Sequence, residues 1–458
     1  MEALKKLLVY IAIFALIYPA NIMLGAPKDG QVVKGQATIK LSGSNMVIEQ
    51  ESKRSVINWD SFDIGVKEKV SHNMPSPDSA GLHRVIGGKG ASQIAGKLES
   101  NGNVYLVNPD GAVIHKGAKI DTGGFVVSTN DINDDNFMRD NLVFDKVGNP
   151  NASIINHGEI NIREKGLGVL VAPTVRNEGL IAAKLGQVAL ASGDAYKLDV
   201  YGDDLINFNV KEEDVDRLYS TEGVPLGVEN TGQIKAEGGV VLLSASQLDN
   251  IVGSVVNNGG VINASSVEQK GGKIVLKAAG DKGAVVNIGE ITASSEKSDG
   301  GSVRLVADGA VKVSGPIEAK GGKEGGKVDI SGKMKTELTG AKIETEGKKG
   351  GLIRVGGEFQ GGKENLNEQN ENFVNRFDDL PNLSSTSELS VDAATLVNAG
   401  NDGTLITWSH GLTSIEGTLL GKYVETSGHG LRMITMPYIS EGGEWIIDPR
   451  NLTVADGN

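Results

Sequence analysis

Apolar and polar positions alternate along most of the chain in short runs that begin with glycine. Clear examples are GLGVLVA at 166–172, GGVVLLSA at 238–245, GGKIVLKA at 271–278 and GGSVRLVA at 300–307. Alternation with a period of two sends one row of side chains inward and the other toward solvent, which is typical of half-buried β-strands. The pattern therefore predicts many short strands, each introduced by glycine.

A second phrase recurs between these strands and places Gly two residues after an Asn. Both residue types tolerate the left-handed backbone conformation that a sharp corner requires. The phrase is centred on Asn156, Asn177, Asn230, Asn257 and Asn287. Successive positions differ by 21, 53, 27 and 30 residues, and we interpret the step of 53 as two units with an insertion.

Units of about 20 to 30 residues cannot close a hydrophobic core alone, so they must stack on one another. The sequence therefore predicts an all-β fold, a right-handed parallel β-helix (solenoid) with an N-terminal β cap. Propellers and stacked sandwiches are the alternatives. Propeller repeats of about 40 to 50 residues, or sandwich turns roughly every 8 to 12 residues, do not fit residues 154–357.

Two polar segments interrupt the repeat. Residues 196–226 and 360–384 are charged and poor in Gly at their centres, with helix-compatible stretches at 211–218 and 371–377. We expect both to be short excursions from the rod, either plain surface insertions or binding loops, since loops carry function without disturbing stacked coils.

Composition narrows the function classes. Glycine accounts for 63 of 458 residues, about 14% and roughly twice its usual share, which argues against a helix bundle. The net charge of −13 argues against nucleic acid as a partner, because phosphate binding needs a basic surface. The chain has no Cys, and its six His lack metal-binding spacing, so neither a metal site nor a cofactor is predicted.

The N-terminus resembles a secretory signal peptide over residues 1–26, with an uncertain cleavage site. Lys5 and Lys6 precede an uncharged apolar run from Leu7 to Ile17, as in the charged and hydrophobic regions of such peptides. A membrane anchor is the alternative, but the run is shorter than the roughly 18 to 20 residues of a spanning helix. We expect an exported mature protein without a transmembrane segment.

Residues 55–132 then carry a specific resemblance. SVINWDSFDIG at 55–65 and the segment from GLHRVIGG to GGFVVSTNDI at 81–132 closely resemble the haemagglutination-activity domain of filamentous haemagglutinin and the high-molecular-weight adhesins. Those proteins are exoproteins of two-partner secretion systems. The motifs INW, RV-x-GG, NG-x-V-x-L-x-NP-x-G and GGF-x-x-ST occur in the order that the family has, and the likeness extends over about residues 30–270.

The resemblance implies a site at the family's NPNG tetrapeptide. Asn108, Pro109, Asp110 and Gly111 occupy these positions here, with Asp110 in place of the family's second Asn. By resemblance, these residues contribute to recognition by an outer-membrane two-partner secretion transporter. The alternative is that they only shape a turn, because Pro fixes φ and Asp and Gly suit turn geometry. His83 and His115 are two further departures from the residues that the family usually has.

The resemblance also implies an organisation and a function. Residues 27–270 would form the secretion domain and residues 271–458 a β-helical shaft, complete or truncated. The rod would act as an adhesin or haemagglutinin that binds an unidentified receptor on a host or bacterial surface, and no enzymatic activity is expected. One alternative is the N-terminal part of a contact-dependent toxin-delivery exoprotein. The other is a polysaccharide-degrading β-helix enzyme, which would carry paired carboxylates in one groove.

Overall fold

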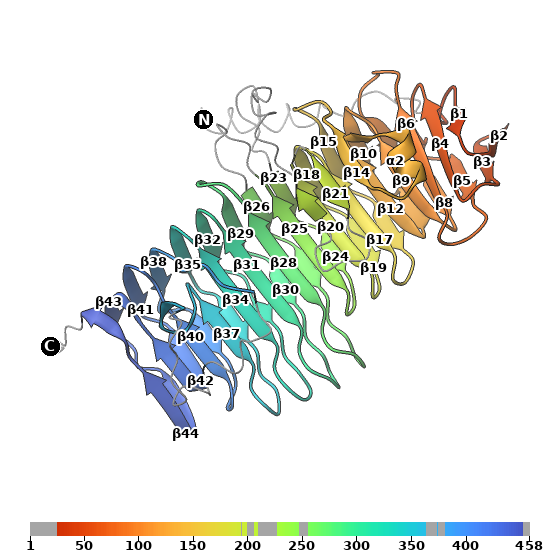
Figure 1. Ribbon diagram of the computed structural model, residues 1–458. Helices are drawn as coiled ribbons and strands as arrows, with labels where there is room; N and C mark the ends of the chain where they lie inside the picture. The colour runs from red at the N-terminus through yellow and green to blue at the C-terminus, as the bar shows by residue number, and fades with distance from the viewer. Residues whose placement is uncertain are drawn as a thin grey trace, which may run out of the picture.

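The chain forms an elongated stack of coils, with the first strands at one end of the rod and the last at the other (Figure 1). The computed structural model describes residues 25–193, 195–198, 206–208, 227–246, 255–362, 373 and 381–451. The predicted signal peptide, except residues 25 and 26, lies outside the described residues. So do the helix-compatible stretches at 211–218 and 371–377, apart from Phe373.

Each coil contributes one strand to each of three faces, which we call B, A and C in chain order. Faces A and B, together with two strands of the N-terminal cap, make a 28-stranded sheet, and face C makes a separate 13-stranded sheet. Along each face, every strand pairs in parallel with the equivalent strand one coil further on. The predicted parallel β-helix is confirmed.

Face A contains the longest regular strands. Its members are β4 (Arg54–Trp59), β6 (Ala80–Val85), β9 (Asn103–Val107), β12 (Gly124–Ser128), β17 (Leu167–Val171), β20 (Gln187–Ser192), β25 (Val240–Ala245), β28 (Lys273–Ala278), β31 (Ser302–Ala307), β34 (Lys327–Gly332), β37 (Leu352–Val355), β40 (Thr404–Thr407) and the second halves of β42 (Thr418–Thr426) and β44 (Tyr438–Ile446).

Face B has shorter strands, several of three residues or fewer. Its members are β3 (Asn45–Gln50), β5 (Lys69–Asn73), β8 (Lys97–Ser100), β11 (Lys119–Thr122), β16 (Glu159–Ile162), β19 (Leu180–Ala183), β24 (Gln233–Lys235), β27 (Val261–Asn263), β30 (Glu290–Thr292), β33 (Ile317–Glu318), β36 (Lys342–Glu344), β39 (Leu396–Asn398) and the first halves of β42 and β44.

Face C runs from near the N-terminal cap to the last described strand. Its members are β7 (Ser92–Ile94), β10 (Gly111–Ile114), β15 (Ser153–Asn156), β18 (Thr174–Asn177), β23 (Gly227–Asn230), β26 (Val255–Asn258), β29 (Ala284–Asn287), β32 (Ala310–Val313), β35 (Lys335–Leu338), β38 (Glu388–Val391), β41 (Leu412–Ile415), β43 (Gly428–Met433) and β45 (Pro449–Asn451).

The alternating residues of the sequence repeat form the core inside the rod. Ile274 and Leu276 of β28 pair in register with Val303 and Leu305 of β31, and all four side chains are buried. Equivalent apolar residues continue from Ile48 to Val424 as one hydrophobic cluster. The glycine-led strands of the sequence are therefore core strands, as predicted.

A ladder of buried Asn side chains runs along the corner between faces C and B. Asn156, Asn177, Asn230, Asn258 and Asn287 are fully buried, and each donates from its amide nitrogen to the amide oxygen of the next at 2.7–2.8 Å. Our assignment of Asn257 to this series was wrong by one residue. In the run of two Asn and two Gly at 257–260, Asn258 pairs with Asn230 and Asn287.

The interpretation of the 53-residue step as two units was also wrong. Asn177 of β18 pairs directly with Asn230 of β23, so the step is a single coil. The additional residues leave the stack between β20 and β23. The described part of this insertion contains β21 (Tyr196–Leu198) and β22 (Ile206–Phe208), which lie outside the rod.

The N-terminal end of the rod carries the predicted cap. β1 (Gln31–Lys34) pairs antiparallel with β4, and β2 (Ala37–Ser42) pairs antiparallel with β3. These strands reverse the parallel order of the coils, so they cover the strand edge at this end of the stack.

A four-stranded antiparallel sheet covers the outside of face A near the cap. It contains β13 (Asp131–Ile132), β14 (Val143–Lys146), β21 and β22, with α2 (Asp134–Met138) between β13 and β14. Its side chains form a second hydrophobic cluster with the outward residues of face A, in which the Phe144 and Tyr196 rings stack 4.7 Å apart. The first predicted excursion therefore contributes β21 and β22 to a lid on face A. A separate departure from the stack, between β12 and β15, contributes β13, β14 and α2 and was not predicted.

The second predicted excursion lies over the far half of face A. Its described part includes the 3₁₀ turn η2 (Phe359–Gly361). Phe359 and Phe373 pack with Ile406 and Trp408 in a third hydrophobic cluster.

Candidate partner-binding site

The tetrapeptide Asn108–Gly111 forms the corner between β9 of face A and β10 of face C. The Gly111 amide donates to the Asn108 carbonyl at 2.9 Å, which closes a β-turn over Pro109 and Asp110. The Asp110 amide donates to the Asn108 side-chain oxygen at 3.0 Å. The predicted turn is present, and the Asn side chain supports it from within.

Asn108 is buried and ties the corner to its neighbours. Its amide nitrogen donates to the Gly90 carbonyl at 3.1 Å and to the Ser92 hydroxyl at 3.0 Å. Its backbone amide donates to the Ser128 carbonyl at 3.0 Å. Both ends of the Asn108 side chain are therefore bonded inside the fold.

Asp110 links the corners of three successive coils. One carboxylate oxygen accepts from the Gly90 amide at 3.2 Å, and the other accepts from the Asn149 side chain at 3.3 Å. The Asn149 backbone also donates to the Pro109 carbonyl at 3.0 Å. The departure from the family's Asn thus places a carboxylate where two donors meet.

Gly111 occupies a position that excludes other residues. Its φ of +93° lies in the left-handed region, and a Cβ atom there would lie 2.0 Å from the Ser153 carbonyl oxygen of the next coil. The glycine therefore serves both the turn and the close approach of the coils.

Pro109 is the exposed member of the tetrapeptide, whereas Asp110 is half-buried and the other two residues are buried. The four residues that the sequence singled out do lie together at one corner. Only Pro109 and part of Asp110, however, face solvent in the folded protein.

Beside this corner, Arg84 of β6 holds the lid to the rod. Its guanidinium contacts Asp131 at 2.8 Å and Asp134 at 2.7 Å, and it donates to the Ile132 carbonyl at 2.7 Å. Burial lowers the pKa of Arg84, but the two carboxylates outweigh burial and hold that pKa above its ordinary value. The lid is thus fixed by a charged cluster that did not figure among the predicted site residues.

His83 belongs to a buried chain of rings that the sequence did not reveal. Trp59 Nε1 donates to His83 Nδ1 at 3.1 Å, and His83 Nε2 lies 3.0 Å from His72 Nδ1. Burial lowers the pKa of His72 to about 4, and burial together with His72 lowers the pKa of His83 well below its ordinary value. The departure of His83 from the family's usual Asn was the one signal in the sequence.

His115, the other departure, lies at the corner after β10. Its Nε2 lies 2.7 Å from the Gln93 side-chain oxygen. Burial, and then the neighbouring His157, lower its pKa. Among the residues described, no three His, Asp or Glu side chains gather in a way that could hold a metal ion.

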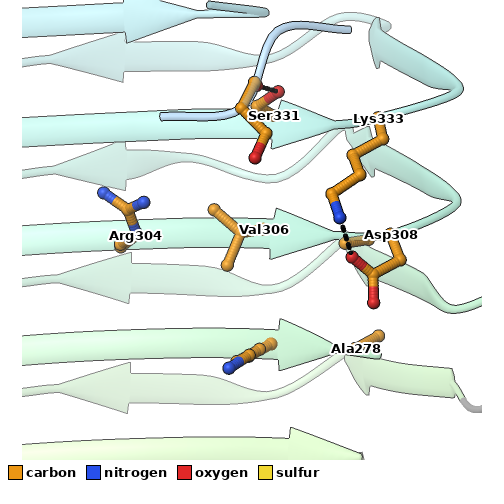
Figure 2. Close-up of a pocket in the computed structure, with 9 residues that line it drawn as sticks. Ala278, Arg304, Val306, Asp308, Ser331 and Lys333 are labelled. Carbon is orange, nitrogen blue, oxygen red and sulfur yellow. Dashed lines mark hydrogen bonds and ion pairs between the residues drawn. The ribbon is translucent and has the colours of Figure 1, made fainter. Parts of the chain in front are cut away.

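A small pocket lies on the outside of face A, near the second excursion (Figure 2). Its carboxylates are ion-paired: Asp308 contacts Lys333 at 2.7 Å, and the adjoining Asp329 contacts both Arg304 and Arg354 at 2.7 Å. Burial raises the pKa of Asp308, but Lys333 and the Gly280 amide hold it below its ordinary value. A general acid needs the opposite shift, so Asp308 lacks the raised pKa that sugar cleavage requires of its acid.

Within the described residues, no helix has both the length and the apolar character that a membrane span requires.

Comparisons with known proteins agree with one another. A family profile described as "TPS secretion domain" matches residues 25–291. A heme/hemopexin-binding protein of Haemophilus influenzae is 32% identical over 260 residues, which are 55% of this chain and 27% of that protein. A second heme/hemopexin-binding protein of Haemophilus influenzae is 29% identical over 354 residues, which are 70% of this chain and 36% of that protein. The chain thus spans about a quarter to a third of the length of these relatives.

One solved structure has the same fold over most of the chain. The HMW1 secretion domain from Haemophilus influenzae superposes with a TM-score of 0.67 at 28% identity, covering 92% of this chain and 100% of that one.

Proposed function

The chain belongs to the TPS secretion domain family, and from this premise we propose that it is exported by an outer-membrane transporter that recognises its N-terminal region. The family is one of secretion domains of adhesin-type exoproteins and not an enzyme family. In this proposal residues 27–270 act as the secretion domain, and residues 271–458 act as the shaft of a rod presented at or beyond the bacterial surface.

We propose that Pro109 and Asp110 contact the transporter, while Asn108 and Gly111 act by shaping the turn. The observation that carries this division is burial: Pro109 is exposed and Asn108 is bonded at both ends of its side chain. The two roles predict different effects of substitution.

The test is secretion of single variants together with the cognate transporter, alongside urea unfolding of each variant. Pro109→Ala should lower secretion and leave the unfolding midpoint unchanged. Asn108→Ala should lower both, because it leaves buried partners of the side chain unpaired. If Pro109→Ala is secreted like the parent, and export falls only in step with stability, the tetrapeptide has no recognition role.

We propose cell-surface adhesion as the activity of the rod, in line with the adhesin-type family. A second candidate is binding of a heme-carrying protein, favoured by the names of the two relatives above. Immobilised hemopexin, with and without heme, should retain the purified protein if the second candidate holds. Binding to epithelial cells without binding to hemopexin would instead favour adhesion.

A further inference from the structure

An outward-facing row of side chains crosses face A from the lid to the second excursion. In register along the strands it passes from Val126 and Val169 under the lid, through half-buried Leu242 and Val275, to Arg304, Asp329 and Arg354. The row changes from apolar to charged between β28 and β31. Between these two strands, neither the lid sheet nor the described part of the second excursion buries the row completely.

The charged part of the row anchors the second excursion. Arg354 holds Asp329 through two hydrogen bonds of 2.7 Å, and their side chains are only 3% and 4% exposed. Arg304 donates to the same carboxylate at 2.7 Å and to the carbonyls of Pro381 and Asn382 at 3.2 and 2.7 Å. One buried carboxylate is therefore shared by two guanidinium groups.

Because Asp329 is shared with Arg354, its carboxylate neutralises the charge of Arg304 only in part. Burial lowers the pKa of Arg304, Asp329 raises it, and Arg354 lowers it again, so that the pKa lies below its ordinary value. The pKa of Arg84, which contacts two carboxylates and, among the described residues, no second guanidinium, is shifted in the opposite direction. A cation with a lowered pKa is one that an additional anion would stabilise.

The pocket beside Arg304 adds further cations. It has a volume of about 170 Å³ and is lined by Lys277, Ala278, Arg304, Val306, Ala307, Asp308, Ser331, Lys333 and Ser384. In Figure 2, Arg304, Val306 and Asp308 follow one another along β31, with Ala278 on one side and Ser331 and Lys333 on the other.

Charge does not balance at this pocket. Lys333 is paired with Asp308, whereas exposed Lys277 of β28 has no ion pair within the described part of the chain. The adjoining network adds two cations, Arg304 and Arg354, and two carboxylates, Asp329 and Glu358. The pocket and this network together contain four cations and three carboxylates. Among the described residues, one positive charge is therefore in excess. Lys277 contributes to lowering the pKa of Asp308 but has no carboxylate within ion-pair distance.

We propose that this pocket binds the carboxylate group of a small sugar acid, with Lys277 as the principal charge partner and Arg304 beside it. The half-buried side chain of Val306 supplies an apolar contact for the ring, and Ser331 and Ser384 also line the pocket. Pockets that enclose drug-sized molecules measure about 300 to 1,000 Å³, so a pocket of 170 Å³ accommodates one small unit. The site is separate from the corner proposed for transporter recognition.

The test is a titration of the purified full chain with glucuronate, monitored by ligand-observed NMR. A salt concentration of about 0.15 M screens the interactions with distant charges. Glucose is the matched neutral ligand, since it has the same ring without the carboxylate. We expect a dissociation constant for glucuronate on the order of 1 mM and at least tenfold weaker binding of glucose.

Lys277→Ala should weaken glucuronate binding about tenfold, as loss of one charge-assisted contact implies. Lys277→Arg should retain it within about threefold because the charge remains. Lys273→Ala is the control: it removes the same charge from an exposed position of the same strand, outside the pocket lining, and should leave binding unchanged. Equal binding of glucose and glucuronate, or equal loss in Lys273→Ala and Lys277→Ala, would overturn the proposal.

Discussion

The tautomers of the buried histidines follow from a single donor. An indole nitrogen only donates, so Trp59 makes His83 Nδ1 an acceptor and leaves the His83 proton on Nε2. That proton is donated to His72 Nδ1, and the His72 proton is then on Nε2, which is buried and has no hydrogen-bond partner among the described residues. Both rings are thus held neutral, and a proton added to either would break the chain.

This chain of hydrogen-bonded rings predicts acid sensitivity of the first coils of the rod, next to the N-terminal cap. The pKa of His72 is about 4 in the folded protein, against 6.5 for an ordinary histidine, so the unfolded state binds more protons between these two pH values. Stability is therefore fully present above pH 6.5 and falls as pH drops toward 4, by on the order of 3 kcal/mol for His72 alone. Urea unfolding of His72→Leu between pH 7.5 and 4 should show a flatter dependence than the parent. His429→Asn, at an exposed histidine, is the control, and an unchanged slope in His72→Leu would contradict the assignment.

At the scale of elements, the Asn ladder gives each coil a fixed register against the next. Asn230 accepts from Asn177 and donates to Asn258, each at 2.8 Å. Asn230→Ala would remove one hydrogen bond from each of two buried amides, those of Asn177 and Asn258, and should lower the free energy of unfolding by about 2 to 4 kcal/mol. Asn257→Ala is the matched control beside the ladder, with an expected change below about 1 kcal/mol. Chemical denaturation measures both, and equal effects would contradict the register.

The attachment of the second excursion depends on one buried arginine. Arg354→Ala removes both bonds to the Asp329 carboxylate and leaves that buried group with Arg304 alone. Loss of one partner of a buried ion pair costs about 3 to 5 kcal/mol. We expect faster hydrogen exchange at 381–387 in this variant, with the coils near Asn156 unaffected. Unchanged exchange at 381–387 would show that the aromatic cluster around Phe373 holds the excursion by itself.

The sequence was sufficient to predict the coils and insufficient to predict what covers them. Alternation of Ile274, Leu276 and their equivalents determines which side chains face inward, and stacking follows because no single coil closes a core. The same alternation cannot say whether the outward residues meet water or a lid. Val126 and Val169 are buried by residues of the lid, which come from other segments of the chain. The misassignment of Asn257 has a different cause, since a shift of one residue within the run of two Asn and two Gly leaves the local sequence pattern unchanged.

At the scale of the candidate site, the resemblance located the corner but not its chemistry. The position of Asn108–Gly111 followed from the motif, whereas the bonds of Asp110 to Gly90 and Asn149 depend on neighbouring coils. The shared carboxylate at Asp329 depends on strands 25 residues apart on each side. Such contacts arise from stacking and have no signature within any one repeat.

The whole molecule is nearly one-dimensional, since each coil contacts chiefly its two neighbours. A local defect should therefore remain local. In Asn230→Ala we expect reduced hydrogen-exchange protection within residues 174–290 and parental protection at 388–430, measured by mass spectrometry. Uniform loss of protection along the chain would indicate a single cooperative unit instead.

The chain departs furthest from the stack at one and the same corner, between faces A and C. The described residues between β12 and β15, β20 and β23, and β37 and β38 all leave there, and Asn108–Gly111 turns there as well. Because successive coils rise by about 4.8 Å, the distance between two departures along this edge is set by the number of coils between them. The first and last of these departures are seven coils apart, or about 34 Å, and deletion of a plain coil between them would shorten that spacing by one step. For a partner that binds two of these departures simultaneously, the avidity would therefore depend on the number of coils between them.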